Sequence, residues 1–144
     1  MSIEDRAKAE IEALHVFFVG WFSGSLPLDA FESGFMQRFD SAFLLIPPEG
    51  RVLALEDLAS GIQSGHGSNP DFRIAIRNVQ VRRQFDGNVL CTYEEWQRNA
   101  KATEPPDNAR VATVLFKEGD PLKWLHVHET TMPDDLIAQG TFDF

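Results

Sequence analysis

Glu129 combines the residue type and the spacing that proton chemistry needs. It follows Leu125 and Val127 at intervals of two residues, so all three side chains share one face of a predicted strand over 122–131. A buried carboxylate is costly unless it is paired, and burial raises its pKa, as a general base requires. Glu129 is therefore the first candidate for a catalytic base. The structural alternative is an ion pair with Arg110 or Arg98.

A second set of candidates lies in the predicted strand over 89–100. Glu94 and Trp96 share one face of this strand, while Tyr93 and Glu95 share the other. A carboxylate of the Glu94–Glu95 pair is an alternative base, with Glu94 preferred, and Tyr93 or His15 is the predicted proton donor. No arrangement of serine, histidine and aspartate at this spacing indicates a nucleophile.

An apolar stripe on the first predicted helix favours a cavity floor. His15, Phe18 and Trp21 recur at helical spacing, which is also typical of an ordinary core. A histidine on such a stripe needs a hydrogen-bond partner, so His15 is the most informative of the three. The residues predicted to line a ligand pocket are His15, Phe18, Trp21, Trp96, Arg110 and Val127.

Strand alternation puts Trp124, His126 and His128 on the face opposite Glu129. Two histidines at this spacing can share a metal ion, but a stable site needs a third protein ligand, and His15 and His66 are distant in sequence. A packed or interface role is favoured, and neither a metal nor a cofactor is predicted. We expect a homodimer through this face, weakened between about pH 7 and pH 5 as histidines gain charge.

Composition bounds the remaining possibilities. The chain has 144 residues, which fits one domain over 1–144, and its formal net charge of −9 disfavours nucleic acid or an anionic membrane as a partner. The apolar run over 16–22 is too short to cross a bilayer. A lone cysteine, Cys91, cannot form an intramolecular disulfide and fits a reducing compartment, so we expect a cytoplasmic protein.

The elements that must position these residues follow an α+β order. Ser2 and Gly24 suit the ends of a long helix, Pro27 opens a short one, and a buried strand over 40–46 precedes a third helix with Leu55 on its apolar face. Four strands then follow over 72–84, 89–100, 109–117 and 122–131. A parity change near Asn78 indicates a bulge, and Asp86-Gly87 indicates a hairpin. We predict a curved antiparallel sheet packed on the N-terminal helices.

This order resembles the nuclear-transport-factor-two-like, cystatin-like superfamily over about residues 3–131. The run His126-Val127-His128-Glu129-Thr130 is similar to the last strand of the calcium/calmodulin-dependent kinase association domain. The hairpin of Ile76-Arg77-Asn78-Val79-Gln80-Val81 and Cys91-Thr92-Tyr93 is similar to the one before it. The superfamily also includes ketosteroid isomerase and SnoaL-type cyclases. The resemblance implies a cone with an internal pocket and a dimer through the convex side of the sheet.

Because that superfamily contains both enzymes and association modules, fold alone does not choose between them. We expect a protein that binds a small molecule or associates through a conical apolar pocket. The alternative is a cofactor-free isomerase or cyclase with a pocket carboxylate as general base. Two departures matter: the first helix lacks the tyrosine of ketosteroid isomerase, and Glu129 stands where the association domain has an arginine. A cationic or hydrogen-bond-donating ligand is therefore expected over an acid.

Overall fold

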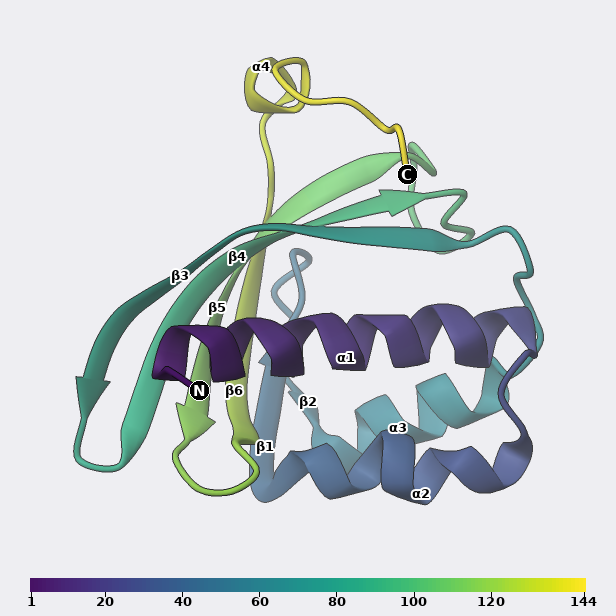
Figure 1. The fold of residues 1–144 in the computed structure, drawn as a ribbon. Helices are drawn as coiled ribbons and strands as arrows, with labels where there is room; N and C mark the ends of the chain where they lie inside the picture. Colours follow the sequence, from purple (N-terminus) through teal and green to yellow (C-terminus); the bar gives the residue numbers. More distant parts are fainter.

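The computed structural model describes residues 1–144 and has three main helices, a six-stranded sheet and a short C-terminal helix (Figure 1). The elements are α1 (Ile3–Ser23), α2 (Phe31–Gly34), β1 (Phe39–Ile46), β2 (Leu53–Ala54), α3 (Leu55–Ser64), β3 (Arg73–Phe85), β4 (Asn88–Arg98), β5 (Asn108–Lys117), β6 (Lys123–Thr131) and α4 (Asp134–Ile137). Single 3-10 turns at Leu28–Ala30 and Met36–Arg38 flank α2. None of the helices combines the length and apolar character needed to cross a membrane.

Helix α1 begins and ends at the predicted residues. The side chain of Ser2 accepts a hydrogen bond from the Asp5 amide at 3.1 Å, which satisfies one of the free N–H groups of the first turn. Gly24 ends the helix with φ of 82° in the left-handed region, where glycine carries no side-chain penalty. The buried face of α1 comprises Ala7, Ile11, Leu14, His15, Phe17 and Trp21.

The strand order is β2-β1-β6-β5-β4-β3. The last four strands form the predicted antiparallel meander. The sheet as a whole is mixed, because β1 pairs in parallel with β6. Phe39 at the start of β1 lies opposite Trp124 near the start of β6, so the chain leaving α2 enters the sheet at the end where β6 also begins. The predicted antiparallel arrangement is thus confirmed for β3 to β6, and the parallel pairing of β1 with β6 was not predicted.

Two predicted irregularities in the meander are confirmed. The β3–β4 register shifts between Arg77 and Gln80, with Asn78 at φ of 56°, which is the expected bulge. Asp86 and Gly87 both have positive φ, as a tight two-residue hairpin requires. Bulges of this kind increase local twist and let the sheet curl.

A third irregularity overturns part of the predicted face assignment. The β5–β6 register shifts so that Leu115 pairs with His126 but Phe116 pairs with Trp124. Leu125 is the extra residue, and the strand therefore changes parity between Trp124 and His126. Trp124 turns inward and is 1% exposed, so its predicted place on the outer face beside His126 and His128 is wrong.

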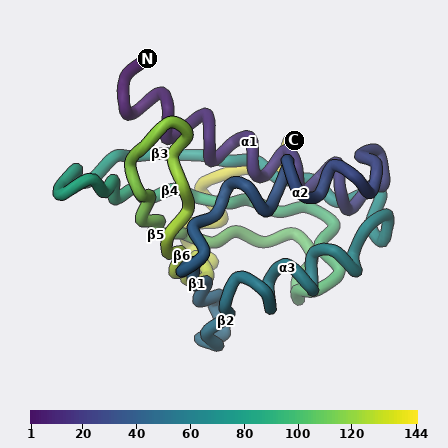
Figure 2. Tube along the Cα trace, turned by 90° about the horizontal axis from the view of Figure 1, so that it is seen from below, coloured from purple at the N-terminus to yellow at the C-terminus, as the bar shows by residue number.

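The curved sheet wraps around one side of the helices. Helix α1 lies across its concave face, with α2 and α3 beside it (Figures 1 and 2). Helix α4 and the last residues lie on the opposite, convex side (Figure 1). The largest fully buried side chains of the core are Trp21, Trp124, Phe35, Phe116, Ile11, Val89, Val114 and Cys91. This layering leaves one cavity between α1, α3 and the sheet.

Candidate functional site

The cavity has a volume of about 180 Å³ and is mainly apolar. Thirteen of its 18 lining residues are hydrophobic, and the rest form a polar group on one side. The apolar lining comes from α1, β1, α3 and the sheet and includes Leu14, Phe18, Phe39, Phe43, Leu58, Ile62, Ile74 and Val127. The polar group is His15, Glu95, Gln97, Arg110 and Glu129, with the hydroxyl of Tyr93 beside it.

His15 has hydrogen-bond acceptors beside both ring nitrogens. Its Nδ1 lies 2.7 Å from the carbonyl of Ile11, one turn earlier in α1, and its Nε2 lies 3.0 Å from Oε1 of Glu95. A carbonyl oxygen only accepts, as does an ionised carboxylate, so this geometry favours a proton on each nitrogen. Burial disfavours the charged ring, but the charge of Glu95 and the hydrogen bonds to Glu95 and Ile11 together outweigh burial, and the pKa of His15 is raised.

Glu95 is the ionised partner of this pair. Burial alone would raise its pKa, but the charges of His15 and Arg110 and a 2.5 Å hydrogen bond from Gln97 Nε2 lower the pKa to about 2. Both carboxylate oxygens of Glu95 thus accept hydrogen bonds from the protein. Glu95 is consequently suited to fixing His15 and not to exchanging a proton with a ligand.

Glu129 has the opposite character. Burial and the nearby charge of Glu95 raise its pKa to about 7, although Arg110 acts against both. Arg110 Nη1 donates to Oε1 at 3.2 Å, and Oε2 accepts no hydrogen bond from the protein. Arg110 and Glu129 are thus joined by one hydrogen bond and not by a bidentate pair. Oε2 of Glu129, a readily protonated group, is left free at the cavity wall.

Tyr93 supplies a neutral hydroxyl to the same cavity. The residue is 2% exposed, and its ring meets the edge of His15 at a centroid distance of 5.7 Å. Burial, followed by the charges of Glu95 and Glu129, raises its pKa well above the usual value. The phenol therefore stays protonated at neutral pH and forms no hydrogen bond within the protein, so it can donate one to a ligand.

Three residues predicted for the pocket lie elsewhere. Glu94 faces the convex side, where its carboxylate accepts hydrogen bonds from Trp96 Nε1 at 2.9 Å and from Asn78 at 3.2 Å. Trp96 is buried on that side under the C-terminal residues. Trp21 belongs to the core but does not line the cavity, and its indole N–H donates to the carbonyl of Ile62. His15, Phe18, Tyr93, Arg110, Val127 and Glu129 do lie at the cavity wall.

Gln97 is a polar wall residue that the sequence did not indicate, and Glu95 was considered only as the alternative to Glu94. The signal was present, because Val89, Cys91 and Tyr93 precede them at the same parity and are all buried. That apolar series identifies the inward face of β4 and assigns Glu95, rather than Glu94, to the cavity.

The outer histidines do not build a metal site. His128 is exposed and His126 is half-buried on the face opposite Glu129. No group of three histidine, cysteine, aspartate or glutamate side chains is arranged to hold a metal ion.

A second hollow adjoins the cavity. It has a volume of about 310 Å³ and shares Phe22, Phe72, Gln97 and Arg110 with the inner cavity. Arg110 lines both spaces, and its Nε is buried without a hydrogen-bond partner. Arg110, the partner of Glu129, thus lies where the two spaces adjoin.

The fold is that of the nuclear-transport-factor-two-like, cystatin-like superfamily. A solved protein of this fold from Pseudomonas aeruginosa, of unknown function, is 28% identical, with a TM-score of 0.79 and coverage of 89% of this chain and 99% of the other. A putative calcium/calmodulin-dependent protein kinase type II association domain from Thiobacillus denitrificans has 22% identity, a TM-score of 0.62 and coverage of 88% and 94%.

A putative ketosteroid isomerase from Shewanella frigidimarina has the same fold, with 16% identity, a TM-score of 0.61 and coverage of 87% of this chain and 94% of the other. No protein-family model matches the chain, and no curated protein matches it. The resemblance stated from the sequence is thus confirmed at the level of the fold.

Proposed function

We propose that this protein binds a small, largely apolar molecule in the cavity between α1 and the sheet. The observation that carries this proposal is the lining: hydrophobic side chains on most of the wall and a compact polar group on one side. Ligand sites in proteins commonly combine an apolar wall with a few convergent polar groups that fix orientation.

The polar group favours a ligand without net charge. His15 is paired with Glu95, and Arg110 with Glu129, so the four charges cancel in pairs when Glu129 is ionised. What remains for a ligand is the hydroxyl of Tyr93 and the free oxygen of Glu129. This arrangement offers a donor and an acceptor at one end of an apolar space. It revises the expected preference for a cation, since Arg110 already compensates the charge of Glu129.

A second candidate function is proton transfer without a cofactor, as in an isomerase or cyclase. Glu129 is the base in this proposal because its pKa of about 7 lets it both accept and release a proton near neutral pH. Tyr93 would donate a hydrogen bond to an oxygen of the substrate that gains negative charge. The single hydrogen bond from Arg110 leaves Glu129 Oε2 free to reach a substrate C–H group.

A ligand screen with a matched pair of variants tests both candidates. Thermal melts of the wild type, Glu129→Gln and Glu94→Gln would be recorded with neutral ketones and alcohols, amines and carboxylic acids of similar size. We expect neutral compounds to raise the melting temperature most, Glu129→Gln to change the order of preference, and Glu94→Gln to leave it unchanged. If no class of compound stabilises the wild type, or if Glu129→Gln leaves the preferences unchanged, the cavity proposal is wrong.

Isotope exchange separates binding from catalysis. A ketone that binds would be incubated in deuterated buffer, and exchange at the carbon next to its carbonyl group would be followed by NMR. Proton transfer predicts exchange that Glu129→Gln abolishes and Glu94→Gln retains. If the ketone binds but exchanges no faster than in buffer alone, the ligand-binding proposal stands and the proton-transfer proposal is wrong.

We further propose that the protein self-associates through the convex side of the sheet, on the surface carrying His126 and His128. Support comes from the similarity to an association domain and to a hub domain of calcium/calmodulin-dependent kinase from S. rosetta. The half-buried side chains of Leu115 and Ile46 and the 37%-exposed Leu44 adjoin these histidines across the sheet. Trp124, which was expected on this surface, faces the core and takes no part in it. Sedimentation velocity showing a monomer at tens of micromolar protein would contradict the proposal.

A cytoplasmic setting remains part of the proposal. Its support is Cys91, a free and fully buried thiol whose pKa burial raises to about 11. A protein recovered from cells in an extracytoplasmic fraction would contradict this assignment.

A further inference from the structure

The last residues of the chain fold back over the convex side of the sheet. Met132 packs with Trp96 and Ala109 in a buried cluster that is separate from the main core, and Phe142 and Phe144 pack against it. Figure 1 shows α4 and the C-terminal segment on the side of the sheet opposite α1. Residues 140–144, with the sequence GTFDF, form this bound segment.

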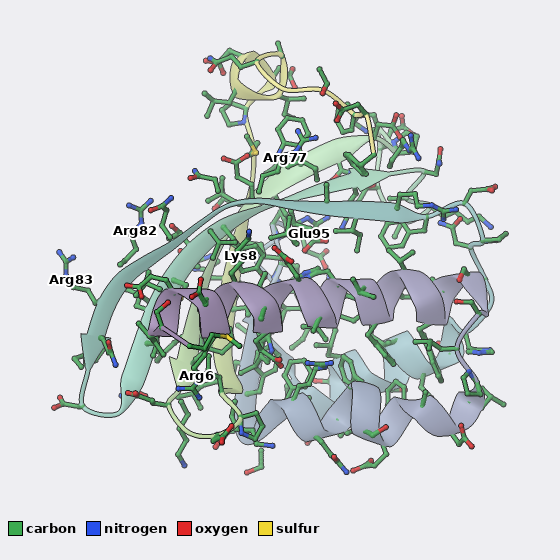
Figure 3. The ribbon with its side chains drawn as sticks, viewed as in Figure 1. Arg6, Lys8, Arg77, Arg82, Arg83 and Glu95 are labelled. Carbon is green, nitrogen blue, oxygen red and sulfur yellow. The ribbon has the colours of Figure 1, made fainter.

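Arg77 is the main polar contact for this segment. Its Nη2 donates to the carbonyl of Thr141 at 2.8 Å and to the carboxylate of Asp143 at 3.1 Å, while its guanidinium lies 4.5 Å from the ring centre of Trp96. Figure 3 shows Arg77 and Glu95 on opposite sides of the sheet. One arginine therefore holds a main-chain carbonyl and an acidic side chain while it stacks on an aromatic ring.

Two aromatic side chains of the segment have defined positions. Phe142 meets the edge of the Trp96 ring at a centroid distance of 5.2 Å, and the guanidinium of Arg98 lies 5.5 Å from the ring centre of Phe144. Edge-to-face aromatic contacts and arginine–ring contacts each add specificity to apolar burial. The segment is thus recognised at both phenylalanines as well as at Asp143.

Gly140 lets the chain approach closely enough for these contacts. A Cβ atom at this position would lie 2.4 Å from the Trp96 ring, too close for any other residue without a shift. The Trp96 surface is therefore matched to a peptide that begins with glycine and continues with an aromatic–acidic–aromatic pattern.

The composition of the surface is that of a binding site for a separate peptide. Tryptophan and arginine are enriched among the residues that dominate interface energies. Arg77 and Arg98 bring two positive charges to this surface, against the single carboxylate of Glu94, on a chain with a net charge of −9, and Arg98 Nε is buried without a hydrogen-bond partner. The surface complements an acidic peptide in charge and complements an aromatic one in shape.

We propose that the Trp96–Arg77–Arg98 surface is a peptide-binding site for an acidic segment with flanking aromatic residues from a partner protein. Residues 140–144 occupy the site within the chain and compete with that partner. An intramolecular segment acts at an effective concentration in the millimolar range, so a partner binds strongly only when the segment is displaced or weakened.

The test uses the 144-residue chain with its own segment weakened by Phe142→Ala and Phe144→Ala together. The probe is the labelled peptide QGTFDF, amidated so that its terminal charge plays no part, and binding is followed by fluorescence anisotropy. We expect saturable binding to the double variant that is at least about 100-fold tighter than to the wild type, because competition within the chain is removed. A peptide in which alanine replaces both phenylalanines should not bind.

Two further variants in the same background locate the binding. Arg77→Gln should weaken peptide binding by at least about tenfold, since it removes the contacts to the main chain and the acid. Arg82→Gln, on the same strand and outside the site, should leave the affinity unchanged. Near-UV circular dichroism confirms that each variant keeps its fold.

Three outcomes would overturn the proposal. The double variant could bind QGTFDF no better than the wild type, or it could bind the alanine peptide equally well. The double variant could also dimerise through the exposed Trp96–Arg77–Arg98 surface, and excess peptide could fail to dissociate the dimer. The surface would then bind a second copy of the chain and not a partner peptide.

Discussion

The two faces of β4 differ in how their polar residues are satisfied, although the residues alternate along one strand. On the inner face, Glu95 is bonded to His15 from α1 and to Gln97, inside the closed core. On the outer face, Glu94 bonds to its near neighbour Trp96 and to the adjoining strand. The inner network joins elements distant in sequence, whereas the outer one joins neighbours and is covered by the end of the chain.

This difference indicates which changes the fold can absorb. An inner charge that loses its partner remains buried, and a buried unpaired charge is expensive. An outer group that loses its partner can reach water once the C-terminal segment moves. Substitutions at matched positions on the two faces should therefore lower the free energy of unfolding by different amounts. The difference between these amounts tests the contrast between the faces.

The largest expected contrast is between two tryptophans. Trp21→Ala should lower the free energy of unfolding by about 3–5 kcal/mol, because Trp21 is fully buried in the main core and its indole N–H is hydrogen-bonded. Trp96→Ala should cost less, by at least about 1 kcal/mol, because the covering segment can rearrange or leave. Urea unfolding of both variants measures the two losses in free energy of unfolding. Equal losses would show that the outer cluster stabilises the fold as much as the main core does.

A smaller contrast is expected between the adjacent carboxylates. Glu95→Gln should cost about 3 kcal/mol, because it leaves the His15 imidazolium buried without its counter-charge. Glu94→Gln should cost about 1 kcal/mol or less, since an amide oxygen can still accept from Trp96. Urea midpoints at pH 7 measure both changes in stability. If Glu95→Gln left stability unchanged, His15 would be uncharged in the folded protein.

The two inner carboxylates should respond to pH in opposite directions. The pKa of Glu129 is raised from 4.5 to about 7, so its folded form binds more protons and stability falls as pH rises from about 4.5 to 7. The pKa of Glu95 is lowered to about 2, so its contribution is present above pH 4.5 and is lost as pH falls toward 2.

Glu129→Gln isolates the first of these effects. The variant should exceed the wild type in stability at pH 8 by about 1–3 kcal/mol, and the two should converge near pH 4. Free energies of unfolding measured every half unit of pH give the difference. A variant that is less stable than the wild type at pH 8 would show that the Arg110–Glu129 pair is structural.

The smallest expected effect concerns the outer surface alone. His128→Glu should weaken a dimer formed through this surface by about tenfold, because symmetry brings equal charges from both copies into the interface. Gln63→Glu on α3 changes net charge equally but lies on the helical side, so it should leave association unchanged. Sedimentation equilibrium of the two variants provides the comparison, and equal effects would indicate general repulsion.

Regular alternation and capping made much of the fold predictable. The ends of α1, the bulge at Asn78, the hairpin at Asp86-Gly87 and the four-strand meander follow from local sequence, where cause and effect lie within a few residues. The site was predictable only in part. His15 was expected to need a partner, but its partner is 80 residues away, and sequence spacing cannot specify such a contact.

Two errors each misplaced side chains by one position along a strand. A single inserted residue reverses the inward and outward sides of a strand. The extra residue Leu125 turned Trp124 inward, and no turn residue marks it in the sequence. On β4, choosing Glu94 over Glu95 was likewise an error of one position. The parallel β1–β6 pairing was missed for another reason, because no local signal connects strands that are so far apart.

That parallel pairing has a consequence for the order of folding. Leu44 pairs with His126, so roughly eighty residues must be looped out before β1 can join the sheet. The hairpins of β3 to β6 close much shorter loops, and contacts between distant residues slow folding. We expect the meander to gain amide protection first in pulsed hydrogen exchange, with β1 protected later. The cavity would then close last, after Arg110 and Glu129 have already met on their shared hairpin.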